Sequence, residues 1–250
     1  MIQLTIIRIE GYGPWTVTLG SDREAQLQML QAEIYHEVQQ RFSEKNCIVF
    51  FNRFDEYFAI TNGLDEIDHK AILRELSERF EDLKMSMAIG VGKTAFEANL
   101  DAFNARKKGK MFDNEARIFG NAVDQTETVQ IMHIDVDSSK KVSDNQSPYE
   151  ITALVTTIYD RLVHEFLKLN SLTFFLGGDN FMVISNGVTK EKADSTIKKV
   201  TAGIEIKLNC GIGIGKTGRK AAEGATMALD TIRDLRKAGK IQPIYEIRCL

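Results

Sequence analysis

The sequence predicts an α+β protein in which one βαββαβ unit occurs twice in tandem. Three pairs of segments share similar residues, the same order and nearly the same offset: 50–63 with 174–187 at 124 positions, 88–94 with 211–217 at 123, and 6–10 with 131–135 at 125. Unrelated segments rarely keep both order and spacing. We therefore infer an internal duplication.

The elements of the second half follow from periodicity and turn signals. Apolar residues recur at helical spacing from Ile151 to Leu169, so a helix is expected near 148–169. Short apolar runs flank Gly-Gly-Asp-Asn at 177–180, which indicates a tight hairpin. The remaining expected elements are a strand near 128–135, a helix near 189–202, a strand at 204–214, and a helix to Lys237 with Thr217 as N-cap.

The first half repeats this order, with a helix expected from about 22 to 42. The order βαββαβ predicts an antiparallel sheet covered by helices on one face, the ferredoxin-like plan. We place an N-terminal domain at 1–110, a polar, glycine-containing linker at 111–125, and a C-terminal domain at 126–250.

Composition narrows the classes of partner. The formal net charge is −3, which lacks the basic footprint that duplex nucleic acid demands, so no nucleic-acid partner is expected. Three dispersed cysteines form no CxxC pair, which argues against a disulfide framework or a thiolate zinc site. No apolar run reaches a membrane span, and residues 1–10 alternate like a strand rather than a signal peptide. We expect a cytoplasmic protein without a membrane partner.

Two aspartates are the candidate catalytic and metal-binding residues. In a βαββαβ sheet the first strand lies beside the central hairpin, so Asp135 should lie near Asp179 at the tip. Adjacent carboxylates need a compensating cation, and oxygen ligands suit Mg²⁺ or Mn²⁺, with two ions able to activate water. Gly177 and Gly178 would let a nucleotide approach the backbone. The alternative is an ordinary Gly-Asp turn.

The first half should carry a degenerate copy of this site. Glu10 and Asp55 are expected at the positions equivalent to Asp135 and Asp179. Arg53 and Phe54 replace the glycine pair, so Arg53 can neutralise the site and Phe54 would crowd a nucleotide. We expect a structural or accessory role for this half.

The segment after Asp135 is a candidate phosphate loop. Small residues with free amides followed by a lysine suit polyphosphate oxygens, and the candidates are Asp137, Ser138, Ser139 and Lys140. A solvated loop is nearly as compatible with the sequence. His133 is better interpreted as a packed or surface histidine than as a catalytic one.

Further phosphate contacts are expected from the C-terminal part. Gly-Lys-Thr occurs at 92–94 and 215–217, but Met87 and Cys210 stand where a P-loop needs glycine, so neither is a P-loop. Lys216 can still contact a phosphate. Arg233 and Arg236 lie in the last expected helix and can reach inward, although helical arginines are usually solvated.

These motifs together resemble known nucleotide enzymes. Residues 134–137 (IDVD) with 177–180 (GGDN) resemble the palm-type nucleotidyl cyclases, including the GGDEF diguanylate cyclases. The whole chain is similar to the archaeal GTP cyclohydrolase III family, on five segments: 12–16 (YGPWT), 53–55 (RFD), 60–63 (ITNG), 175–181 (FLGGDNF) and 211–215 (GIGIG).

The resemblance implies two palm-like domains, a homotetramer and hydrolysis of GTP. The guanine imidazole ring is opened and the triphosphate cleaved, giving 2-amino-5-formylamino-6-ribosylamino-4(3H)-pyrimidinone 5′-phosphate and two phosphates. It further implies Mg²⁺, and K⁺ or another monovalent cation as activator. The metal ligands carried over are Asp135, Asp179 and the Val136 carbonyl, and by analogy with the cyclases Gly177, Gly178, Asn180 and residues 137–140 face the nucleotide.

Two other functions remain open on the sequence. A nucleotidyl or diguanylate cyclase would share the metal site, although cyclases usually pair two complete sites and often carry sensor domains. A non-catalytic GTP sensor would bind nucleotide without turnover. The residues that read the guanine base, the order of the two hydrolytic steps and any contribution of the first half to catalysis are not determined by the sequence.

Overall fold

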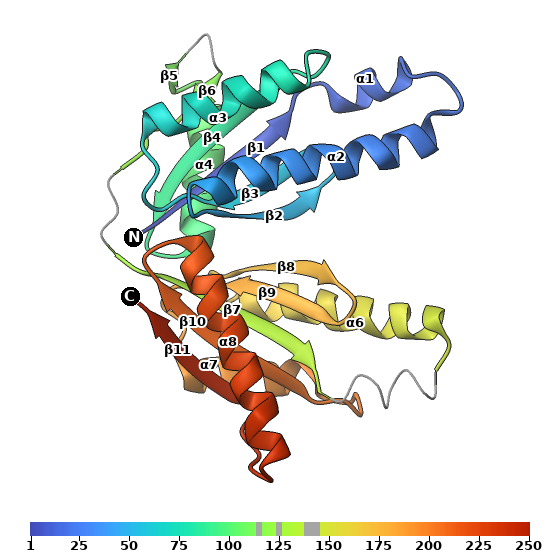
Figure 1. The fold of residues 1–250 in the computed structure, drawn as a ribbon, viewed down its shortest axis with the longest axis vertical. Helices are drawn as coiled ribbons and strands as arrows, with labels where there is room; N and C mark the ends of the chain where they lie inside the picture. Colours follow the sequence, from blue (N-terminus) through green and yellow to red (C-terminus); the bar gives the residue numbers. More distant parts are fainter. Residues whose placement is uncertain (114–116, 124–126, 138–145) are drawn as a thin grey trace. The chain divides into compact units, whose positions relative to one another are not determined.

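The computed structural model describes residues 1–113, 117–123, 127–137 and 146–250 (Figure 1). The chain divides into two compact units. Unit 1 comprises Met1–Gly92 and Glu97–Glu127, and unit 2 comprises Lys93–Phe96 and Thr128–Leu250. Each unit has its own sheet and its own hydrophobic core.

Unit 1 contains a sheet in the order β2-β3-β1-β4-β6-β5. The first four of these strands reproduce the ferredoxin-like order. Part of the expected linker belongs to this sheet, because β6 pairs parallel with β4 and antiparallel with β5. The elements are β1 (Ile2–Ile9), α1 (Tyr12–Val17), α2 (Arg23–Glu44), β2 (Ile48–Arg53), β3 (Glu56–Ile60), α3 (Glu66–Arg79), β4 (Met85–Gly92), α4 (Ala95–Lys107), β5 (Met111–Asp113) and β6 (Ile118–Phe119).

Unit 2 repeats the plan with a sheet in the order β11-β10-β7-β9-β8. The duplicated α+β, ferredoxin-like fold predicted from the sequence is therefore confirmed. Strand β11 adds to the edge by pairing parallel with β10. The elements are β7 (Val129–Val136), α6 (Pro148–Leu167), β8 (Leu172–Gly177), β9 (Asn180–Ile184), α7 (Lys190–Val200), β10 (Leu208–Gly215), α8 (Gly218–Lys237) and β11 (Ile244–Cys249).

Local signals fix the ends of the helices in unit 2. Ser147 and Glu150 form a reciprocal capping box in front of α6, with Pro148 in its first turn. The Thr217 side chain accepts a hydrogen bond from the Lys220 amide, which confirms Thr217 as the N-cap of α8. Strand β10 begins at Leu208 rather than at 204, because the chain turns at Gly203, whose φ is +75°.

The sheet of each unit is covered by helices on both faces, so the expectation of a single covered face is wrong. In unit 2, Met132 and Ile134 pack with α6 and α7, whereas the alternate residues of β7 face α8. Helix α8 lies directly on β10, since a Cβ added at Gly213 would lie 1.9 Å from the Ala221 carbonyl oxygen. In unit 1, the lack of a side chain at Gly90 lets α4 pack closely against β4 in the same way.

The first strands of the two units correspond at an offset that is two residues larger than the 125 expected from the sequence. Asp135 lies opposite Asn180 and Asn209, whereas Arg8 lies opposite Glu56 and Ser86. Glu56 and Asn180 each follow the turn aspartate, so Arg8 corresponds to Asp135 at an offset of 127, and Glu10 corresponds to Asp137. A slip of two residues preserves the in-out alternation of a strand, which is why the sequence pattern did not reveal it.

Candidate functional site

The tip of the β8–β9 hairpin is built by the glycine pair. Gly177 has φ of +107° and Gly178 has φ of +60°, a region where side chains are strained. The pairing register shifts between Phe175 and Gly177, so the strand bends before the turn. A Cβ added at Gly177 would meet no atom within 4 Å. The glycines therefore serve the turn conformation and leave open space above the backbone.

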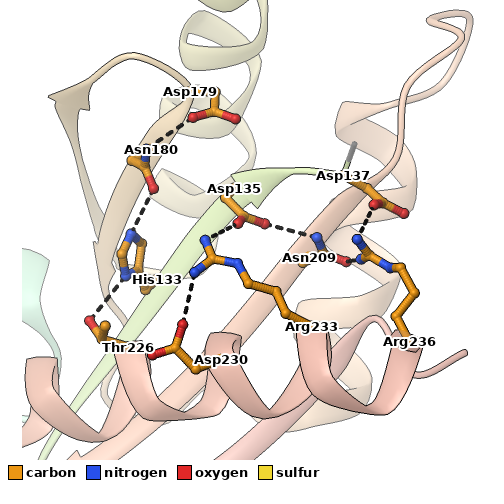
Figure 2. Close-up of polar contacts among 10 residues, drawn as sticks. All are labelled: His133, Asp135, Asp137, Asp179, Asn180, Asn209, Thr226, Asp230, Arg233 and Arg236. Carbon is orange, nitrogen blue, oxygen red and sulfur yellow. Dashed lines mark hydrogen bonds and ion pairs between the residues drawn. The ribbon is translucent and has the colours of Figure 1, made fainter. Parts of the chain in front are cut away.

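The two candidate aspartates come from adjacent strands. Asp135 is the second-to-last residue of β7, and its partner in the ladder is Asn180, the first residue of β9. Asp179 immediately precedes Asn180 in the turn. The ladder partner of Asp135 is therefore the residue that follows Asp179, so the two aspartates lie on adjacent strands near the hairpin tip (Figure 2).

Asp135 is a buried carboxylate with charged and polar partners. The residue is 6% exposed, and its carboxylate accepts hydrogen bonds from Arg233 Nη2 at 2.8 Å and from Asn209 Nδ2 at 2.9 Å. The carboxylate hydrogen bond raises the pKa of Arg233 above its ordinary value. Asp230 also accepts from Arg233, at 2.8 Å. A buried charge needs such pairing, so Arg233 balances Asp135 in this arrangement.

A second ion pair adjoins the first. Arg236 lies 2.6 Å from the Asp137 carboxylate and donates to the Asn209 amide oxygen at 2.8 Å. Asn209 thus connects both pairs, with its amide nitrogen on Asp135 and its oxygen on Arg236 (Figure 2). Both arginines extend from one face of α8, three residues apart, over the end of β7.

A third chain of polar contacts runs from the hairpin tip to α8. Asn180 donates to Asp179 at 3.0 Å, and its amide oxygen lies 3.1 Å from His133 Nε2. This arrangement makes Nε2 the protonated nitrogen, so Nδ1 accepts from Thr226 at 3.2 Å. Burial lowers the pKa of His133, which favours the neutral ring. His133 is a half-buried residue that orients Asn180 beside Asp179 (Figure 2).

The donor chemistry of the site fits magnesium when a nucleotide completes the coordination. The candidate ligands Asp135 and Asp179 offer only oxygen, the type of ligand that Mg²⁺ prefers. Across the described residues, no group of three or more His, Cys, Asp or Glu side chains could hold a metal ion. Mg²⁺ commonly uses one or two carboxylates and takes its other ligands from phosphate and water.

Not every predicted residue lies at this site. Lys216 follows Gly215, which pairs with Val129 at the far end of β7 from Asp135. Lys216 is seven positions after Asn209, the partner of Asp135, which corresponds to about 23 Å along a strand. Lys216 is therefore not part of the cluster. Ser138, Ser139 and Lys140 lie outside the described residues, and Val136 has a buried side chain.

Three residues of the cluster were missed on the sequence: Asn209, Thr226 and Asp230. Asn209 is 4% exposed and interrupts an apolar strand, which is a signal that could have been used. Thr226, Asp230 and Arg233 follow i, i+4, i+7 spacing, so they form one polar stripe on α8.

A cavity of about 310 Å³ lies on the α6 side of the same hairpin. Gly178 lines it together with Tyr159 and Phe175, and Tyr159 stacks on Phe181 at a centroid distance of 6.1 Å. Thr152 and Thr156 from α6 supply hydroxyl groups to its wall. Its size lies at the lower end of the range for small-ligand sites, about 300–1,000 Å³.

Unit 1 lacks the carboxylate pair. Arg8 occupies the position of Asp135, and Arg53 lies 3.5 Å from Asp55 at the hairpin tip. Glu10, the counterpart of Asp137, is bound by Arg106 and by the Ser86 hydroxyl, each at 2.5 Å. Glu10 and Asp55 thus each have a cationic partner within the unit.

Comparison with known proteins places the chain in one family. The family model described as GTP cyclohydrolase III matches residues 1–244. The GTP cyclohydrolase III of Methanobrevibacter smithii is 36% identical, covering 94% of each chain, and that of Methanocaldococcus jannaschii is 37% identical, covering 93% of this chain and 88% of the relative. A solved GGDEF domain from Pseudomonas aeruginosa aligns with a TM-score of 0.39 at 18% identity, covering 48% of this chain and 84% of that domain. The chain belongs to the GTP cyclohydrolase III family.

Proposed function

We propose that the protein is a GTP cyclohydrolase, a hydrolase that opens the guanine imidazole ring and cleaves the triphosphate of GTP. The products would be 2-amino-5-formylamino-6-ribosylamino-4(3H)-pyrimidinone 5′-phosphate and two phosphates. One water adds across C8 and N9 of the ring, and two waters cleave the phosphoanhydride bonds. The observation that carries the proposal is the Asp135–Asp179 pair beside the open glycine tip, in a chain whose relatives bear this name.

Asp135, Asp179 and the carbonyl of Val136 are the proposed ligands of Mg²⁺. Unit 1 does not repeat this set, because Arg8 replaces Asp135 there.

 Magnesium bound there, as one or two ions, would activate water and stabilise the charge that develops on phosphate oxygens. The proposal includes K⁺ or another monovalent cation as activator, a homotetrameric assembly and a cytoplasmic location, all of which rest on the resemblance of the chain to its family.

The side chains around this pair have defined tasks in the proposal. Arg233 and Arg236 balance Asp135 and Asp137 in the structure, and guanidinium groups also match phosphate oxygens in a bidentate manner. When a magnesium nucleotide neutralises the carboxylates, the two arginines can turn to the triphosphate. His133 and Asn180 hold the Asp179 carboxylate from the side of the sheet.

The 310 Å³ cavity beside Gly178 is the proposed place for the guanine base. Tyr159 and Phe175 offer aromatic faces for stacking, and the Thr152 and Thr156 hydroxyls can hydrogen-bond to ring edges. The cavity lies next to the Asp135–Asp179 pair, because Gly178 in its wall is directly followed by Asp179. A base in the cavity therefore leaves its triphosphate near the tip.

One assay tests the proposal against the alternatives. The protein is incubated with GTP, Mg²⁺ and K⁺, and phosphate release is followed together with the ultraviolet spectrum. Loss of the purine spectrum with two phosphates per GTP is the expected result. Pyrophosphate with an intact purine would identify a cyclase instead, and unchanged GTP would identify a sensor.

A further inference from the structure

Unit 1 contains a larger cavity that the proposed reaction does not use. It has a volume of about 680 Å³ and lies between α1, the first turns of α2 and the β2–β3 hairpin. Aromatic side chains line much of its wall: Tyr12, Tyr35, Phe51 and Phe54. The polar groups in the wall include Arg23 and Gln31, both from α2.

The cavity is the repeat counterpart of the one beside Gly178. Tyr35, Phe51 and Tyr57 form the same ring cluster as Tyr159, Phe175 and Phe181, at an offset of 124 throughout. Tyr35 stacks on Tyr57 at 5.9 Å, and Tyr159 stacks on Phe181 at 6.1 Å. Both units therefore place an aromatic pocket between the first long helix and the central hairpin.

Two substitutions make the pocket of unit 1 different. Gln31 stands where unit 2 has Val155, and Phe54 stands where unit 2 has Gly178. The Phe54 side chain is 51% exposed and contacts Phe51 with a centroid distance of 5.0 Å. Phe54 was expected from the sequence to crowd a nucleotide, but it lies in the pocket wall, where a half-exposed ring offers a face for stacking.

Gln31 is a buried polar residue aimed into this pocket. It is 9% exposed and lies in the otherwise apolar stripe Leu27, Ile34, Val38 and Phe42 of α2. Its amide nitrogen donates to the Tyr12 hydroxyl, while its amide oxygen accepts no hydrogen bond from any described residue. A glutamine amide presents both a donor and an acceptor, which match the edge of a heteroaromatic base.

We propose that unit 1 binds a purine nucleoside, or its phosphate, in this pocket as a second site without catalysis. Phe54 and the tyrosines take the base by stacking, and Gln31 contacts its edge. Arg23, which lines the same wall and lies 3.7 Å from Glu24, is the cation available to a phosphate. The proposed binding involves no metal, because unit 1 has Arg8 at the position of Asp135. This inference goes beyond the proposed hydrolysis and does not depend on it.

Trp15 provides a probe that is specific to this pocket. It is the single tryptophan of the chain, and its ring lies 5.8 Å from that of Tyr12 in the pocket wall. The experiment titrates the full chain with guanosine in the presence of EDTA and records the emission of Trp15. A saturable change with one guanosine per chain is expected. An unchanged emission up to millimolar guanosine would overturn the proposal.

Matched variants separate this site from unit 2. Gln31→Val and Phe54→Ala should each weaken guanosine binding at least about tenfold, since stacking and edge contacts are lost. Phe175→Ala and Asp179→Asn, both in unit 2, should leave the affinity reported by Trp15 unchanged. Circular dichroism of each variant verifies that the fold is retained.

Two further results would contradict the assignment. Binding that weakens in the unit 2 variants but not in Gln31→Val or Phe54→Ala would place guanosine elsewhere. Equal affinity for uridine would contradict the preference for a purine. Loss of GTP hydrolysis in Asp179→Asn, together with unchanged guanosine binding reported by Trp15, supports both proposals. Absence of guanosine binding in a wild-type protein that still hydrolyses GTP refutes only the second site.

Discussion

At the scale of single residues, charge balance explains the arrangement at the end of β7. Asp135 is buried, and its carboxylate is held by Arg233 and Asn209. Asn209 also binds Arg236, so one amide ties two ion pairs together. Burying a carboxylate is costly without a partner, so Arg233 supplies the compensating positive charge.

Replacing Arg233 should therefore destabilise the metal-free protein. Arg233→Ala leaves Asp135 buried with Asn209 as its remaining partner, and we expect a loss of about 1–3 kcal/mol, discounted because Arg233 is half exposed. Urea denaturation measures this loss. Lys237→Ala is the control, because its ion pair with Asp234 is exposed and should contribute at most about 0.5 kcal/mol. Equal losses in both variants would contradict the charge-balance account.

His69 should make the stability of unit 1 depend on pH. It is fully buried, its Nδ1 donates to the Asp65 carbonyl, and its Nε2 accepts from the Thr5 hydroxyl. Burial lowers its pKa below the ordinary 6.5, so the unfolded state binds the proton first as the pH falls. Stability should therefore be full above about pH 6.5 and decline below it. Melting temperatures of the wild type and His69→Gln measure this, and the variant should show a shallower decline between pH 7.5 and 5.5.

At the scale of secondary-structure elements, glycine spacing decides where α8 lies. Gly211, Gly213 and Gly215 face α8, and they let its backbone approach β10 closely enough for Arg233 and Arg236 to reach the end of β7. The helix carries its polar stripe at i, i+4 and i+7, so one face meets the site along its length.

A methyl group at Gly213 should disrupt this contact. Gly213→Ala would place a Cβ 1.9 Å from the Ala221 carbonyl oxygen and 2.2 Å from the Ala225 amide, so α8 must shift. We expect a loss near the upper end of the range for overpacking, about 1–3 kcal/mol, measured by thermal unfolding. Gly13→Ala is the control, because a Cβ there meets no atom within 4 Å. A similar loss in the control would contradict the role of close packing.

The elements also show what sequence patterns can and cannot specify. Helical spacing and capping residues predicted α6 and the N-cap of α8, and the glycine hairpin with Asp179 was recognisable from its flanking apolar runs. The equivalence of Arg8 and Asp135 in the two repeats could not be recognised from the sequence. A slip of two residues keeps every side chain on the same face of the strand. Asn209 was missed because its partners come from β7 and α8, which are distant in sequence.

At the scale of the whole molecule, one duplicated fold carries two different sites. The aromatic pocket is retained in both units, whereas the carboxylate pair is present in unit 2 and replaced in unit 1 by Arg8 and the Arg53–Asp55 pair. These substitutions are the basis on which we propose catalysis by unit 2 and nucleoside binding by unit 1. The described residues contain no helix that is long and apolar enough to cross a membrane.

Matched substitution of the two turn aspartates tests the central claim most directly. Turnover of GTP is measured with Mg²⁺ and K⁺ for the wild type, Asp179→Asn and Asp55→Asn. Asp179→Asn should lower turnover at least about 100-fold, or ~2.7 kcal/mol of transition-state stabilisation, because it removes one carboxylate of the proposed metal-binding pair. Asp55→Asn should retain turnover within about twofold, because Arg8 stands in place of Asp135 and Arg53 lies 3.5 Å from the Asp55 carboxylate. Full turnover in Asp179→Asn, or its loss in Asp55→Asn, would contradict the assignment of the reaction to unit 2.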